Sequence, residues 1–89
     1  MSVIKKKIPP EYFDLIKSGR KKFEIRVADF EIKEGDTLVL EEYNPKTRKY
    51  SGRKIEKKVS YLLKYPLGMF GQKQLMELFL FGLLIHLLH

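Results

Sequence analysis

Four short stretches of the chain have the pattern of β-strands: residues 3–8, 21–28, 37–43 and 53–65. Two of them alternate with the period of two that places neighbouring side chains on opposite faces of a sheet. In residues 21–28, the alternation separates Phe23, Ile25 and Val27 from Lys22, Glu24 and Arg26. In residues 53–65, the clearest case, one predicted face holds Ile55, Lys57, Val59, Tyr61, Leu63 and Tyr65, with Leu62 on the other.

A short helix of about two turns is predicted after the first strand. Pro9-Pro10 ends the extended segment, and Pro10 suits the first helical position. Tyr12, Leu15 and Ile16 are then spaced to form one apolar stripe. Gly19 fits the position just beyond the helix, where glycine readily takes a positive φ.

The connections between the later strands are predicted from turn residues. Residues 34–36, Glu-Gly-Asp, have the composition of a turn. Residues 44–47, Asn-Pro-Lys-Thr, are typical of a type I turn, and we expect this connection to continue to Gly52.

The tail is almost wholly apolar, since between residues 75 and 88 only Glu77, Gly82 and His86 are not apolar. It is too short for a transmembrane helix, which needs about 20 apolar residues. We predict a short helix over residues 72–80 and a strand over residues 83–88 that is buried on both faces, with His86 packed in the core. The leucine-rich composition also allows a continuous helix, and the tail would then be core or interface.

Together these elements predict one α+β domain over residues 1–89, with about five short strands and two short helices. Strands of this length, joined by turns and hairpins, favour a small, partly closed barrel.

Composition excludes several kinds of site. The chain has no cysteine and only two histidines, so disulfides, thiolate catalysis and zinc centres are not expected, and we predict no metal or cofactor. The amino terminus lacks the apolar segment of a signal peptide, which favours the cytoplasm. The 33% of charged residues, mainly Lys and Glu, is compatible with a thermophile.

The formal net charge of +7 comes from lysines and arginines that all precede residue 74. Such a field favours polyanions through counterion release. It is equally compatible with an ordinary lysine-rich surface. The placement of particular residues must therefore carry the argument for a partner.

The most informative placement is at residues 18–26, where a helix is expected to stop at Gly19 and the chain to enter a strand. The polar side of that strand carries Lys22, Glu24 and Arg26. Glu24 could orient Arg26, whose planar fork suits phosphate, and Lys21 could add a point charge. The alternative is an ordinary ladder of charged side chains on an outer surface.

This stretch resembles a known family. The G-x-K-x-x-E-x-R motif of ASCH domains, in the PUA-like superfamily, is similar to residues 19–26, which read Gly-Arg-Lys-Lys-Phe-Glu-Ile-Arg. The likeness extends over roughly residues 4–68 and includes Ile8-Pro9-Pro10 and Glu34-Gly35-Asp36. It implies a PUA-like pseudo-barrel with an RNA-binding cleft beside the first helix. Lys21, Glu24 and Arg26 would line this cleft, and Tyr43 and Tyr50 would be available to stack on bases.

The chain departs from the family in two places. One branch of the family is an amidohydrolase of acylated cytidine that uses a lysine and a threonine on this segment. Lys21 matches that lysine, but Glu24 stands in place of the threonine, and a carboxylate does not replace the hydroxyl nucleophile. The leucine-rich residues 75–89 also replace the alternating, β-branched strand with which family members usually close the barrel.

Three functions remain open from the sequence. The first is an RNA- or nucleotide-binding module with no membrane partner, whose ligand would be bound by Gly19, Lys21, Lys22, Glu24, Arg26 and Tyr43. The second is a small hydrolase of a modified nucleoside, with Lys21 as base and Glu24 as acid or electrostatic partner. The third is a protein-interaction domain that forms a homodimer through the apolar tail.

Overall fold

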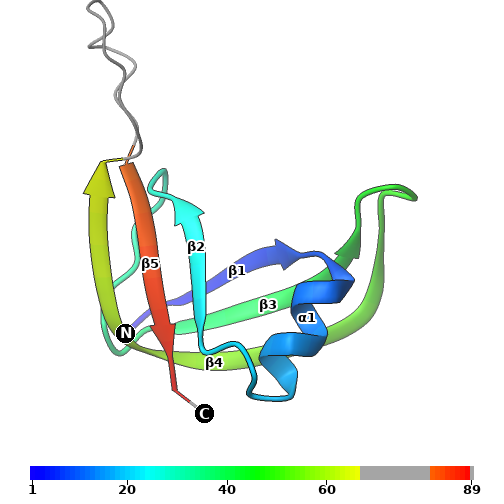
Figure 1. The fold of residues 1–89 in the computed structure, drawn as a ribbon, viewed down its shortest axis with the longest axis horizontal. Helices are drawn as coiled ribbons and strands as arrows, with labels where there is room; N and C mark the ends of the chain where they lie inside the picture. Colours follow the sequence, from blue (N-terminus) through cyan, green and yellow to red (C-terminus); the bar gives the residue numbers. More distant parts are fainter. Residues whose placement is uncertain (67–80, 89) are drawn as a thin grey trace, which may run out of the picture.

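The computed structural model describes residues 1–66 and 81–88 as an α+β fold with one helix and one mixed sheet (Figure 1). The elements are β1 (Val3–Ile8), α1 (Pro10–Lys17), β2 (Phe23–Val27), β3 (Thr37–Asn44), β4 (Lys49–Pro66) and β5 (Phe81–Leu87). The strand order is β1-β3-β4-β5-β2. β1 runs parallel to β3, and the other neighbours are antiparallel. The five predicted strands are therefore confirmed.

β4 joins the two halves of the sheet. Its first half pairs with β3, from Lys49 opposite Asn44 to Lys58 opposite Thr37. Its second half pairs with β5, from Val59 to Pro66. Figure 1 shows β4 curving between these partners, so that the sheet bends around α1. β1 and β2 are the edges of the sheet, which is not closed into a barrel.

The core fills the inner side of this bent sheet. β1, β3, β4 and β5 contribute side chains that are almost wholly buried, and α1 adds Phe13 and Ile16. The cluster consists of Ile8, Phe13, Ile16, Leu38, Leu40, Val59, Leu83, Ile85 and Leu87. Among the described residues, no helix has the length and apolar content needed to cross a membrane.

The predicted first helix is confirmed, but its buried side differs from the predicted stripe. The structure buries Phe13 and Ile16, whereas Tyr12 is exposed and Leu15 is only half-buried. The side of the helix that packs on the sheet is the one that carries Phe13 and Ile16. The spacing of apolar residues alone did not determine which side of the helix faces the sheet. Gly19 has a φ of +82° and its N–H donates to Ile16 O, as expected just beyond a helix end.

The connection between β3 and β4 is shorter than predicted. β4 begins at Lys49, and the turn is stabilised by Asn44, whose side-chain Oδ1 accepts from Lys46 N at 2.9 Å. Gly52 lies inside β4 and not at the end of a loop. It takes a φ of +95° opposite a shift of register between Glu41 and Tyr43, where a β-bulge demands a conformation that glycine adopts easily.

The prediction of one continuous apolar face in residues 53–65 is wrong. A second shift of register lies between Val59 and Tyr61. Val59 is buried, but Tyr61 and Leu63 are 48% and 47% exposed, and Leu62 packs against the core instead. An extra residue in one strand reverses which side chains face inward, and the sequence alternation continues unchanged through it.

The predicted strand in the tail is confirmed as β5, but it is not buried on both faces. Leu83, Ile85 and Leu87 are buried on the inner side, while Leu84 is half-buried on the outer side. His86 is exposed and lies 2.7 Å from Ser60 Oγ, so it is not a core residue. The helix predicted over residues 72–80 falls outside the described residues.

A buried leucine and an exposed leucine make different predictions for the same substitution. Leu40→Ala should lower the free energy of unfolding by about 2–5 kcal/mol, because Leu40 is fully buried and its truncation leaves a cavity. Leu88→Ala is the control, since Leu88 is 49% exposed, and should change it by no more than about 0.5 kcal/mol. Urea unfolding followed by circular dichroism measures both, and equal losses would contradict the burial of Leu40 and the exposure of Leu88.

Candidate functional site

The polar side of β2 faces the inside of the molecule. Glu24 is buried and pairs in register with Ile85 of the core. On the opposite side of the strand, Phe23, Ile25 and Val27 are 40–51% exposed. This strand therefore directs its charged residues inward and its apolar residues outward, the reverse of an ordinary surface ladder.

Arg26 connects the two edges of the sheet through a side chain. Its Nε donates to Glu24 Oε2 at 2.7 Å, and its Nη2 donates to the backbone oxygen of Lys7 on β1. A hydrogen bond between charged groups is short and strong, and it is screened little when half-buried. Glu24 thus fixes the direction of Arg26, as the sequence predicted, and Arg26 spans the gap between β1 and β2. We call this gap the β1–β2 seam.

Lys21 reaches the other oxygen of the same carboxylate. Its Nζ lies 3.7 Å from Glu24 Oε1 and donates to the backbone oxygen of Phe23 at 3.0 Å. The ammonium also lies 5.3 Å from the ring centroid of Tyr12 and 4.6 Å from that of Phe23. Two cations therefore flank one buried carboxylate, so the group carries a net positive charge.

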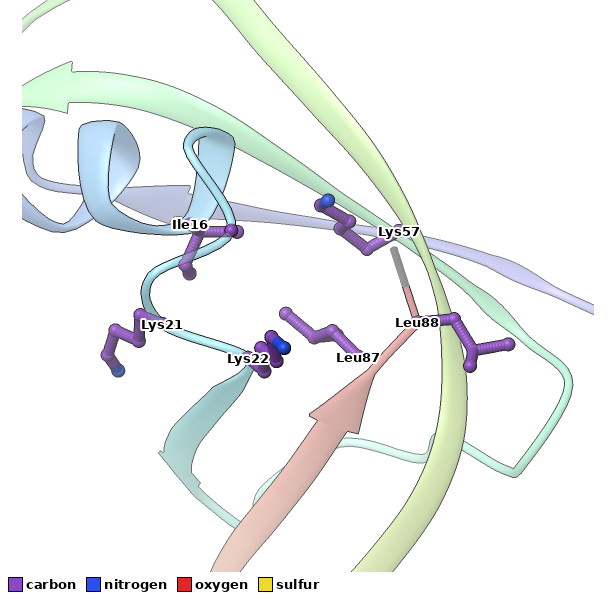
Figure 2. A pocket seen from close by; sticks show the side chains of 7 residues that line it. Ile16, Lys21, Lys22, Lys57, Leu87 and Leu88 are labelled. Carbon is purple, nitrogen blue, oxygen red and sulfur yellow. The ribbon is translucent and has the colours of Figure 1, made fainter.

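Gly19 and Lys22 lie beside this group, at the corner between α1 and β2. They line a hollow that is too shallow to enclose a ligand (Figure 2). The other residues of its lining are Ile16, Lys21, Lys57, Leu87 and Leu88. Figure 2 shows that the hollow is shared by the end of α1, the start of β2, β4 and the end of β5. Lys22 O accepts from Leu87 N at 2.8 Å, which anchors this corner to β5.

Tyr43 lies on β3 and is linked to the seam through Lys7. The Nζ of Lys7 is 4.4 Å from the centroid of the Tyr43 ring, and the backbone oxygen of the same lysine accepts from Arg26. Tyr43 and Tyr50 pack edge to face, with centroids 5.0 Å apart. Tyr50 is the more exposed of the pair, at 53%.

The structure also contains a charged cluster that the sequence analysis did not identify. Arg53 on β4 donates from Nε and Nη2 to the two oxygens of Glu42 on β3, at 2.9 and 2.8 Å. It also donates to Asp14 on α1 at 3.1 Å, and its guanidinium lies 4.5 Å from the centroid of the Phe13 ring. Ser51 Oγ adds a bond of 2.6 Å to Glu42. This cluster fastens α1 to the β3–β4 hairpin.

The electrostatics of this cluster are those of a structural group. Hydrogen bonds from Arg53 and Ser51 lower the pKa of Glu42 from its ordinary value of 4.5 to about 2, and those from Arg53 to Glu42 and Asp14 raise the pKa of the guanidinium. The alternation Leu38, Leu40, Glu42 indicates that the carboxylate lies on the same face as two core leucines, and this was the signal in the sequence. The sequence did not indicate that Arg53, eleven residues later, is the partner of Glu42.

We find no candidate metal site in the part of the chain that the structure describes. Residues 1–66 and 81–88 contain no group of three or more histidine, aspartate or glutamate side chains placed to hold a metal ion. The seam holds two cationic side chains, Lys21 and Arg26, each paired with Glu24.

The Glu42 cluster predicts a defined loss of stability in acid. Because folding lowers the pKa of Glu42, its contribution is fully present above about pH 4.5 and is lost as the pH falls toward about 2. Glu42→Gln should be less stable than the wild type at pH 7, and the difference between their melting temperatures should vanish near pH 2. Glu56→Gln, at an exposed position of β4, is the control and should keep the wild-type pH profile. A constant difference across this range would contradict the assignment.

Comparison with known proteins assigns the chain to a family whose function is unknown. Residues 4–74 match the domain of unknown function DUF3850. The chain is also similar to an uncharacterised 12.9 kDa protein in the GpA 3′ region of Escherichia phage P2, with 37% identity over 54 residues. The match covers 61% of this chain and 48% of the phage protein, so the chain spans about half the length of that relative. Because the family match extends over most of the sequence, including the β1–β2 seam, the chain belongs to the DUF3850 family.

Proposed function

We propose that this chain is an RNA- or nucleotide-binding domain of the ASCH type, with a PUA-like pseudo-barrel whose ligand groove follows the β1–β2 seam beside α1. The observation that carries the proposal is the buried carboxylate of Glu24, which holds Arg26 on one oxygen and has Lys21 near the other. The motif G-x-K-x-x-E-x-R supplies all three side chains.

Arg26 has the geometry of a phosphate-binding residue. A guanidinium carries five N–H donors, and the bonds to Glu24 and Lys7 use one donor on each of two nitrogens. The side chain is 22% exposed, which leaves it within reach of a ligand at the seam. Because Glu24 already orients the planar fork, binding costs little additional side-chain entropy.

Aromatic side chains near these cations supply the second requirement for nucleic-acid binding. Tyr12 is 47% exposed beside Lys21, and Tyr50 is 53% exposed on the hairpin beyond Lys7 and Tyr43. A base stacked on such a ring gains about 1–3 kcal/mol. The net charge of +7 adds a long-range attraction for polyanions.

The architecture supports the pseudo-barrel part of the proposal. One long strand, β4, belongs to both halves of the sheet, so the two edges β1 and β2 are brought toward each other. Arg26 bridges them with a side chain where a closed barrel has backbone hydrogen bonds. Because a side chain and not backbone pairing joins the two edges, we expect polar groups at this seam to be within reach of a ligand.

Amide chemical-shift titrations with short RNAs and with mononucleotides test the proposal and distinguish the two ligand types. We expect the largest shifts in residues 19–26, and an affinity that falls steeply as salt rises. Lys21→Gln or Arg26→Gln should each weaken binding about tenfold, because each removes a charge-assisted contact. Lys58→Gln removes the same charge from an exposed position of β4 and should weaken binding no more than about twofold, through the general field alone.

The proposal fails if neither RNA nor nucleotides bind at low salt. It also fails if Lys58→Gln weakens binding as much as Lys21→Gln does, because the site would then be a diffuse charge and not the seam. Spectra of the free variants show whether each substitution has left the fold intact.

A further inference from the structure

The outer face of the second half of the sheet is apolar, and the ammonium of Lys21 reaches its corner at Phe23, 4.6 Å from the centroid of that ring. Paired residues of β2, β5 and β4 form three rows across it. The rows are Phe23–His86–Tyr61, Ile25–Leu84–Leu63 and Val27–Gly82–Tyr65. In a chain whose residues are 33% charged, these nine adjacent positions carry no Asp, Glu, Lys or Arg. We call this surface the outer apolar face.

The exposed apolar area of this face matches the apolar part of a standard protein interface. Five of its side chains, Phe23, Ile25, Val27, Tyr61 and Leu63, are 40–51% exposed. With roughly 150–250 Å² for a large side chain, they expose about 350–550 Å² of mainly apolar surface. A standard interface buries about 800 Å² per partner, of which somewhat more than half is apolar. The outer apolar face therefore supplies the apolar part of one such interface.

We propose that the outer apolar face binds a second copy of this chain, face to face, about a two-fold axis that runs along the central row through Leu84. This inference is independent of the function proposed for the seam, which opens on the inner side of β2. It uses β2, β4 and β5 together and does not depend on residues 67–80.

The face is complementary to itself in this arrangement. A two-fold axis along the central row places each β5 antiparallel to its counterpart, so that His86 of one copy lies over Gly82 of the other. His86 is exposed, whereas Gly82 has no side chain and is buried between Val27 and Tyr65 in the same row. The exposed imidazole of each copy thus lies over a position without a side chain on the other, twice, and the aligned packing is that of two sheets in a sandwich.

Charge gives the dimer a diagnostic salt dependence. Each copy carries +7, so two copies repel each other at low ionic strength, and the outer apolar face itself adds no charge. Salt screens this repulsion, and association should therefore strengthen as salt rises. Binding to RNA has the opposite dependence, so failure of either proposal is recognised separately.

Sedimentation velocity of the full chain over a range of concentrations tests the proposal. We expect a dimer for the wild type and for Val3→Lys, because Val3 is an exposed apolar residue of β1 outside the face. Ile25→Lys places one charge per copy in the interface and should weaken association about 100-fold or more. A wild type that stays monomeric at all concentrations, or a dimer that persists unchanged in Ile25→Lys, overturns the proposal.

Single cysteines test the symmetry, because the chain has none of its own. Leu84 lies on the proposed axis, and the backbones of two sheets packed face to face are about 10 Å apart, which is too far for a direct disulfide. A bismaleimide with a spacer of about 10 Å should therefore cross-link Leu84→Cys between copies, whereas it should not cross-link Val3→Cys. Circular dichroism confirms that each variant is folded. Equal cross-linking of the two variants would show random collision and would overturn the face-to-face arrangement.

Discussion

The pairing of one continuous strand, β4, with two different partners is the constraint on which the rest of the structure depends. Its first half completes a sheet with β3 and β1, and its second half completes one with β5 and β2. Because both halves share a backbone, the sheet must bend, and the bend creates the inner side that α1 and the core fill. The shift of register after Val59 sets which side chains of the second half point into that core.

The same bend explains why a carboxylate is buried on β2. The inner side of this edge strand faces the gap toward β1, where backbone pairing stops. A buried charge is tolerated only when it is paired and hydrogen-bonded. Glu24 meets this condition through Arg26 and Lys21, and Arg26 in turn bonds to the backbone of β1. The three side chains that satisfy this buried charge are also the ones in which our proposal places ligand recognition.

β2 consequently has two sides of opposite chemistry. The charged side lies against the seam, where our proposal places an anionic ligand. The apolar side contributes Phe23, Ile25 and Val27 to the outer apolar face, where our second proposal places another copy of the chain. A strand with this arrangement is unusual at the surface of a monomer, because its apolar side remains in water unless something covers it.

The sequence by itself determined the local elements. Pro10 and Gly19 fixed the helix, alternation identified the strands, and the spacing of Lys21, Glu24 and Arg26 placed a carboxylate within reach of two cations. It did not determine which side of each strand is buried, because the period of two is the same for either side. That choice depended on the register shift in β4, on the direction from which α1 packs, and on contacts between distant residues such as Arg53 and Asp14. Local periodicity therefore specified the elements, and only long-range pairing in the tertiary structure decided their inner and outer faces.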